Sequence, residues 1–190
     1  MTGCWWPASR PHWQPPPELR QFLDAGPAPV HVGLGSRNVG DPARIGAVVR
    51  GALRRAGLRG VVQAGWTGLS LDDDDIITIG ETPHEWLSPR MAALAHHCGA
   101  GTTAAGLRAG VPTVGLPVLA DQPFWASRLV ALGASPAAVP LGRLSEDRLG
   151  DALSAAVRND RFGQRARHLS RALASEDGAG AVAGAVTRSI

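Results

Sequence analysis

The sequence contains no lysine and no tyrosine, and it has only three phenylalanines. All 19 basic residues are arginine, set against 16 acidic residues, so the formal net charge is only +3. The arginines are scattered and form no dense run with aromatic residues between them. This pattern argues against nucleic acid as a partner. Arginine in the complete absence of lysine is typical of genes from high-GC bacteria.

Cysteine is also scarce, since Cys4 and Cys98 are the only two. They show neither CxxC spacing nor a Cys/His ligand pattern, which argues against a thiolate metal site. Reduced thiols are typical of a cytoplasmic protein, and we expect that location. No run of residues is long and apolar enough to span a bilayer, and the first residues lack the basic and apolar regions of a signal peptide.

The remaining composition is that of a globular domain, with 44% hydrophobic and 18% charged residues in a chain of 190. Residues 1–29 differ, because they hold seven of the 15 prolines and three of the six tryptophans. So much proline excludes long regular structure apart from a short helix at Glu18–Ala25. We interpret 1–29 as an interdomain linker-like segment and 30–190 as one domain with a sizeable core.

From Val30 onward, short apolar runs alternate with segments of helical periodicity. The expected strands are 30–35, 59–66, 75–80, 91–97, 111–117 and 137–141. The expected helices are 41–57, 101–110, 121–133, 145–159 and a tail from 160 that is interrupted at Gly163 and near 178–180. This alternation predicts an α/β fold, a Rossmann-like parallel sheet with helices on both faces. Ligands of such sheets bind beyond the carboxyl ends of the strands.

The stretch AHHCGAGTTAAG, residues 95–106, lies at such a strand end. Its small residues let backbone N–H groups approach a ligand closely, and the helix that follows leaves its first N–H groups without intrahelical partners. The helix dipole favours an anion there, while Thr102, Thr103 and His97 add further donors.

The residues alone leave two other interpretations open. The stretch can be a tight strand–helix corner in which His97 is simply hydrogen-bonded. The run Gly99–Ala104 also fits a GxGxxA dinucleotide fingerprint, with Asp121 at a suitable distance for a ribose. That fingerprint usually opens the first βαβ unit, whereas this run comes several strands into the domain.

The segment HHCGAGTTAAGLRAGVPTVGLPVLADQPFWASRLVALG resembles the donor-binding signature of family 1 GT-B glycosyltransferases, especially the sterol and glycopeptide glucosyltransferase group. The family's usual HHGGAGTT carries Cys98 in its third glycine position here. GLGSRN, ETPHEWLSPRMAALAHH and WQPPPELRQFLDAGPAPV also resemble family segments, so that the resemblance covers essentially the whole chain.

The resemblance implies that the chain is half of a GT-B fold and binds a nucleotide-diphosphate sugar. It implies contacts to the diphosphate from Ser36 and His97, and to phosphate oxygens at the helix N-terminus from Gly99, Gly101, Thr102 and Thr103. It further implies hexose hydroxyl contacts from Asp121 and Gln122, and a nucleoside contact from His84. UDP-glucose is the family-level expectation for the donor, with no metal and no other cofactor.

Some positions depart from the family pattern. Ala105 stands where many relatives carry a glutamate that binds ribose hydroxyls, and Glu81 stands near the place of a base-stacking tryptophan in plant relatives. Trp66 or Trp86 can stack on a base instead, although packing is the commoner use of such residues. The run Asp72–Asp75 contains a DxD pattern, which we interpret as a solvated loop rather than a metal site.

The resemblance also defines what this sequence does not supply. Family enzymes transfer the sugar with inversion to an acceptor hydroxyl on a sterol, lipid or natural product, and their general base is a histidine of an N-terminal acceptor domain. We assign no catalytic residue to His12, His31 or His168, so we expect this chain to be inactive alone. The readings left open are the donor domain of a two-domain enzyme, a separate donor subunit with its acceptor half in trans, and a non-catalytic nucleotide- or dinucleotide-binding module. Surface that faces an acceptor domain is apolar, which predicts self-association.

Overall fold

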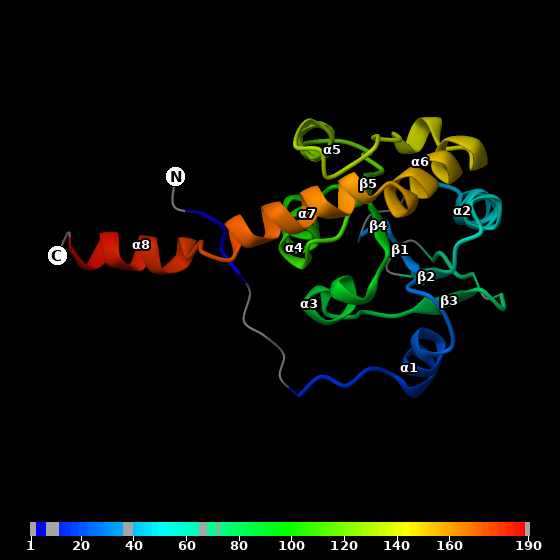
Figure 1. The fold of residues 1–190 in the computed structure, drawn as a ribbon, viewed down its shortest axis with the longest axis horizontal. Coiled ribbons are helices and arrows are strands. Elements are labelled where there is room, and N and C mark those ends of the chain that lie inside the picture. The colour runs from blue at the N-terminus through cyan, green and yellow to red at the C-terminus, as the bar shows by residue number, and fades with distance from the viewer. Residues whose placement is uncertain (1–2, 7–11, 36–39, 65–67, 72, 189–190) are drawn as a thin grey trace.

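The computed structural model describes residues 3–6, 12–35, 40–64, 68–71 and 73–188. Its centre is a five-stranded sheet in the order β3-β2-β1-β4-β5, and all four strand pairs are parallel (Figure 1). The strands are β1 Val30–Gly33, β2 Gly60–Gln63, β3 Ile76–Ile79, β4 Ala93–His96 and β5 Thr113–Gly115. The predicted α/β fold is confirmed.

Helices cover both faces of the sheet. They are α1 Pro17–Asp24, α2 Pro42–Ala56, α3 His84–Leu87, α4 Ala100–Ala109, α5 Gln122–Ala131, α6 Glu146–Arg158, α7 Asp160–Leu173 and α8 Gly178–Thr187, with 3-10 turns η2 Ser88–Arg90 and η3 Leu141–Arg143. In Figure 1, α2 and α6 lie to the right of the strands, and α3, α4 and α7 lie to the left. One buried cluster joins α2 and α6 to β1 and β5, and a second joins α1 and α3 to β2 and β3.

Helix α2 shows why these segments form where they do. The Asp41 carboxylate accepts hydrogen bonds from the N–H groups of Ala43 and Arg44, at 3.0 and 3.1 Å. Pro42 has no N–H to leave unsatisfied at the first position, and Gly57 ends the helix in a left-handed conformation at φ 60°. The predicted boundaries of this helix therefore follow from its caps.

Two expectations about the chain were wrong. Residues 137–141 form no strand, because Val139 donates to Gly115 at 2.7 Å in an isolated bridge and Pro140 cannot extend the pairing. Helix α7 runs through Gly163 without interruption, whereas the break between its end and the start of α8 lies beside the predicted interruption near 178–180. The turns α3 and η2 were not predicted at all.

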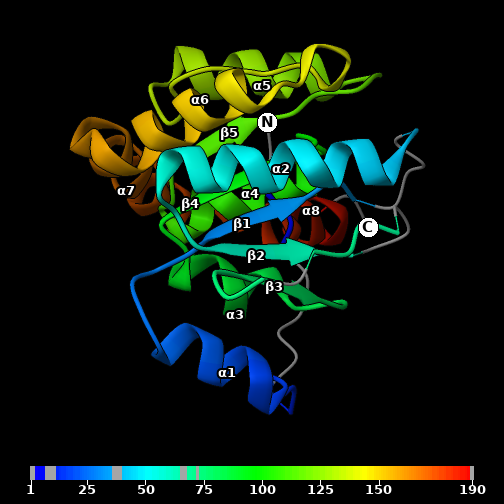
Figure 2. The ribbon, with the colours of Figure 1, turned by 90° about the vertical axis from the view of Figure 1, so that its right-hand side faces the viewer.

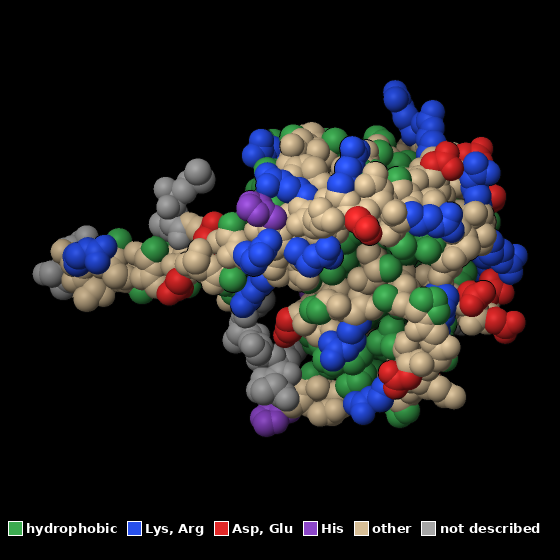
Figure 3. Space-filling model, in the orientation of Figure 1, with side chains coloured by type: hydrophobic (Ala, Val, Ile, Leu, Met, Phe, Trp, Pro, Cys, Tyr) green, Lys and Arg blue, Asp and Glu red, His purple; other side chains and the backbone are tan. Residues whose placement is uncertain are grey.

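The N-terminal segment meets the chain again at the start of α8. The N–H of Cys4 donates to the Glu176 carboxylate at 2.9 Å, and the N–H of Gly178 donates to the Cys4 carbonyl at 3.1 Å. Beyond this contact α8 projects from the body as an arm, with hydrophobic side chains exposed along it (Figure 3). Within the described residues, no helix is both long and apolar enough to cross a bilayer.

Candidate functional site

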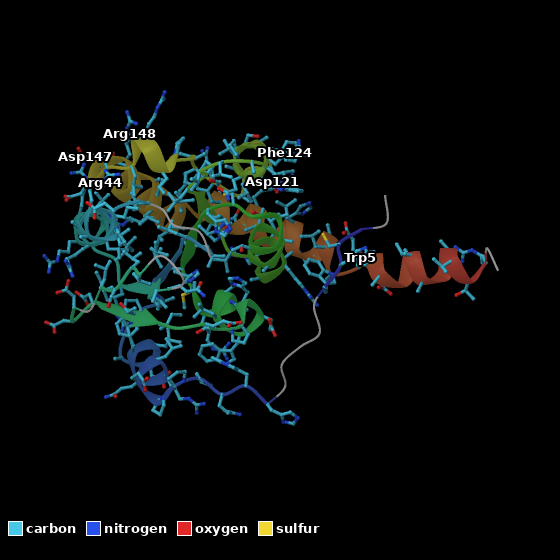
Figure 4. All side chains as sticks on the ribbon, turned by 180° about the vertical axis from the view of Figure 1, so that it is seen from behind. Trp5, Arg44, Asp121, Phe124, Asp147 and Arg148 are labelled. Atoms are coloured by element: carbon cyan, nitrogen blue, oxygen red, sulfur yellow. The ribbon has the colours of Figure 1, made fainter. Side chains whose placement is uncertain are left out.

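The candidate site lies where the strand order of the sheet reverses. Strand β1 pairs with β2 on one side and with β4 on the other, so the loops that follow β1 and β4 diverge from a common crevice. The arrowheads of β1 and β2 in Figure 2 show the direction of the carboxyl ends, and Figure 4 views the molecule from that side. The loops after β1, β3, β4 and β5 therefore all reach the same edge of the sheet.

The turn after β4 leads directly into the N-terminus of α4. Gly99 is the N-cap residue, and no side chain of the described part of the chain caps this end. The N–H groups of the first turn therefore point into the space in front of the helix and are available to a ligand there. Cys98 makes the turn possible by adopting a left-handed conformation at φ 62°, with its side chain fully buried.

His97 is placed by two glycines. A Cβ at Gly35, after β1, would lie 2.7 Å from Cε1 of the His97 ring, and a Cβ at Gly99 would lie 2.6 Å from Nε2. Real Cβ atoms do not approach other atoms so closely. The imidazole therefore lies between the β1 loop and the N-terminus of α4, where the phosphate interpretation requires it.

A pocket of about 410 Å³ opens in front of these residues. Its lining comes from β1, from the ends of β2 and β3, and from α3 and α4: His31, Gly33, Gly35, Gln63, Ala64, Gly80, Glu81, His84, His97 and Thr102. No arginine lines it within the described residues. Imidazoles and backbone N–H groups are thus its main hydrogen-bond donors.

Burial favours the neutral form of His31, His84 and His96. It lowers the pKa of His31 and of His96 from the usual 6.5 to about 3, and neighbouring imidazoles lower both further. Burial also lowers the pKa of His84. The nearby Glu85 carboxylate raises this pKa, whereas the His97 imidazole lowers it further. A dianionic ligand in the pocket would reverse this trend, because negative charge favours the protonated imidazole.

His96 has a structural task in the turn after β4. Its Nδ1 accepts a hydrogen bond from the N–H of Cys98 at 3.0 Å, which leaves the proton of the neutral ring on Nε2. This bond fixes the strained turn that carries His97. His96 therefore orients its neighbour from beneath the turn.

The threonines of α4 differ in position. Thr102 is half-buried and lines the pocket. Thr103 is only 4% exposed, and its hydroxyl has no hydrogen-bond partner among the described residues. A Cβ at Gly101 would meet no described atom within 4 Å, so packing does not require glycine there. Of the two hydroxyls, Thr102 has the more accessible position.

Asp121 and Gln122 follow β5 at the same edge of the sheet, where Figure 4 shows Asp121 with Phe124 at the start of α5. The Asp121 Oδ2 accepts from the Trp125 indole N–H at 2.8 Å, which leaves Oδ1 for a hydroxyl. The Gln122 side chain is buried, and its Oε1 accepts from the N–H of Val118 at 2.8 Å. Gln122 therefore holds the loop, and only its NH₂ group is left to donate to a ligand.

The remaining residues singled out in the sequence are not among the described residues that line the pocket. Ser36 and Trp66 lie outside the described residues. Trp86 packs against Trp13, with ring centroids 5.1 Å apart, and under the Arg90 guanidinium, which accords with a packing role. In the acidic run, Asp73 forms ion pairs with Arg50 at 2.7 Å and Arg54 at 3.3 Å.

Sequence reasoning missed a second groove of about 570 Å³ beside the pocket. Trp5 and Trp6 of the N-terminal segment line it together with residues of α3 and α4, among them Glu85, Ala105 and Arg108. The Arg108 guanidinium lies 4.4 Å from the centre of the Trp6 ring. The tryptophan-rich composition was visible in the sequence, but nothing in it indicated which helix these rings would meet.

Comparison with known proteins identifies the family. Residues 67–188 match the family described as erythromycin biosynthesis protein CIII-like, C-terminal domain. A sterol 3-beta-glucosyltransferase of Arabidopsis thaliana is 40% identical over 92% of this chain and 27% of its own length. The O-mycaminosyltylonolide 6-deoxyallosyltransferase of Streptomyces fradiae is 40% identical over 94% of this chain and 42% of its own length. This chain thus spans less than half the length of either relative.

A solved structure shares the fold. The crystal structure of Arabidopsis thaliana UGT89C1 complexed with UDP aligns with a TM-score of 0.66 at 20% identity, over 83% of this chain and 42% of the other. The two chains thus share a fold over less than half of that structure. The chain therefore belongs to the erythromycin biosynthesis protein CIII-like C-terminal domain family of family 1 GT-B glycosyltransferases.

Proposed function

We propose that this chain binds UDP-glucose as the donor half of an inverting glycosyltransferase. The observation that carries the proposal is the position of His97, fixed between Gly35 and Gly99 in front of the uncapped N-terminus of α4. A diphosphate in this pocket would accept hydrogen bonds from the first turn of α4, from Thr102 and from the His97 ring. The UDP complex of a protein with the same fold supports uridine as the nucleoside.

These contacts have a chemical consequence. In glycosyl transfer the acceptor oxygen bonds to the anomeric carbon while the bond from that carbon to the diphosphate breaks. The departing diphosphate gains negative charge, so donors fixed in advance around it stabilise the transition state more than the ground state. Asp121, held by Trp125, would accept hydroxyl hydrogens of the hexose and orient the anomeric carbon.

The acceptor half of the reaction lies with a domain supplied in cis or in trans. We assign none of the four histidines around the pocket as a general base, since His31 and His96 are buried and His97 and His84 line the donor pocket. The acceptor hydroxyl would belong to a sterol, a lipid or a natural product, the classes suggested by the relatives' names. Without that domain, we expect this chain to bind the donor and not to transfer it.

Isothermal titration calorimetry with UDP, UDP-glucose, dTDP-glucose and NAD tests the proposal. We expect UDP and UDP-glucose to bind the wild-type chain, and His97→Ala to weaken both to the same extent, because the contact is to phosphate. His12→Ala is the matched control, since His12 is exposed in the N-terminal segment. Binding of NAD without binding of any sugar nucleotide would instead support the dinucleotide interpretation and overturn the proposal.

A further inference from the structure

The second groove joins the donor pocket. His84 and Thr102 line both of them, so the two cavities meet at the first turns of α3 and α4. From this junction the groove runs along α4 past Ala105 to Arg108, with Trp5 and Trp6 on its far side. Figure 4 shows Trp5 on the side of the body from which α8 extends.

The groove has a carboxylate beside the junction but none on α4. Ala105 contributes only a methyl group, which cannot accept a hydrogen bond. Glu85 also lines the groove and is exposed. Its carboxylate is close enough to His84 to raise the pKa of that imidazole against the effect of burial.

The covalent structure of a nucleotide determines where its ribose lies relative to the diphosphate. The ribose is joined directly to the α-phosphate, so a diphosphate held at the N-terminus of α4 places the ribose next to that turn. There it meets His84 and Thr102, at the junction of pocket and groove. Its hydroxyls need acceptors once they leave water, and a carboxylate is the group that dinucleotide-binding folds use for this purpose.

We propose that Glu85 accepts hydrogen bonds from the ribose hydroxyls of the bound nucleotide, in the place left without an acceptor by Ala105. The inference rests on the proposed donor function. Glu81 is the rival carboxylate, because it lines the neighbouring pocket. Glu81 follows β3 directly, whereas Glu85 lines the groove that contains Ala105.

Calorimetry with UDP and 2′,3′-dideoxy-UDP tests the assignment, with dTDP and its 3′-deoxy analogue used if the thymidine nucleotide binds more tightly. The wild-type chain should bind the hydroxylated nucleotide about tenfold more tightly than the analogue, as expected for hydrogen bonds to a charged group. Glu85→Ala should remove this preference and leave the affinity for the analogue unchanged. Glu85 is exposed, so the variant should fold, and Glu18→Gln on α1 is the control for a distant carboxylate.

The outcomes separate the inference from the function on which it rests. If the wild-type chain binds UDP and Glu85→Ala keeps the preference for the hydroxylated nucleotide, the role of Glu85 is overturned and the donor function stands. Loss of that preference in Glu81→Gln would have the same meaning. Failure of the wild-type chain to bind any of these nucleotides would overturn both. Ala105→Glu added to Glu85→Ala should restore the preference, because it returns a carboxylate to the same groove, and a double variant without the preference would contradict the placement of the ribose.

Discussion

Gly99 and His97 are sterically coupled: a side chain at Gly99 would lie 2.6 Å from Nε2 of the His97 ring. The backbone of Gly99 is extended at φ −62°, so the residue does not need glycine for its conformation. Glycine is required there only because the imidazole occupies the space. The position of the His97 ring in front of α4 therefore depends on the absence of a side chain at Gly99.

This coupling predicts that Gly99→Ala will act as a binding mutation. The added Cβ should displace the His97 ring from the front of α4, and we expect the affinity for UDP to fall about tenfold, or ~1.4 kcal/mol. Calorimetry measures the affinity, and thermal unfolding should show a much smaller effect on the fold. Gly142→Ala is the matched control, because a Cβ there would meet no described atom within 4 Å. Unchanged UDP affinity in Gly99→Ala would show that His97 does not contact the nucleotide.

Cys98 carries backbone strain that can be measured. Its φ of 62° is a left-handed conformation that costs a side chain about 1–2 kcal/mol. Cys98→Ala keeps this strain and loses the buried sulfur, whereas Cys98→Gly loses the sulfur and Cβ contacts and relieves the strain. We therefore expect Cys98→Gly to unfold at a higher urea concentration than Cys98→Ala, by about 1 kcal/mol in the free energy of unfolding. Equal stabilities would mean that the turn relaxes around the side chain.

The reactivity of the same thiol gives an independent test. Burial raises the pKa of Cys98 to about 12, and the side chain is fully buried. Only the thiolate attacks alkylating reagents. We expect iodoacetamide at pH 8 to modify Cys98 only after denaturation, while Cys4, which is partly accessible, reacts in the folded chain. Mass spectrometry of peptides labelled before and after unfolding distinguishes the two sites.

Acid should destabilise the fold through two buried imidazoles. The pKa of His31 and of His96 is about 3 in the folded chain, below the value of 6.5 expected when unfolded. The unfolded chain therefore binds more protons between these values, so the free energy of unfolding falls as the pH drops from 6.5 toward 3. Each group contributes up to about 1.4 kcal/mol per pH unit in this window.

Urea unfolding at pH 7.5, 6.0 and 5.0 measures this dependence. His31→Gln should reduce the slope of the unfolding free energy against pH, because one buried titrating group is removed. The expected reduction corresponds to about one proton, or ~1.4 kcal/mol per pH unit. His168→Gln, at an exposed position on α7, is the matched control for the substitution itself. A stability that does not change between pH 7.5 and 5.0 would contradict the burial of neutral imidazoles.

The fold and the strand–turn–helix geometry around His97 could be predicted because they follow from local rules. Buried parallel strands are short apolar runs, and α2 is bounded by Asp41 and Gly57 through their capping chemistry. Helix α3 was not predicted because its four residues are held by tertiary burial of Leu87 rather than by their own propensity. The groove was not predicted because it depends on a contact between Trp6 and Arg108, which are far apart in the sequence.

The bond between Trp125 and Asp121 predicts a specific effect on the sugar. Asp121→Ala should lower the affinity for UDP-glucose by about tenfold and the affinity for bare UDP much less, because the carboxylate would contact only the hexose. Trp125→Phe keeps an aromatic ring beside Phe124 but removes the indole N–H that holds Oδ2 at 2.8 Å. The freed carboxylate then loses orientation, and we expect a smaller loss of about threefold for UDP-glucose with none for UDP. Calorimetry of both variants with both ligands measures the four affinities. Equal losses for the two ligands in Asp121→Ala would show that this carboxylate does not bind the hexose, and the remaining contacts of the site would then have to orient the sugar.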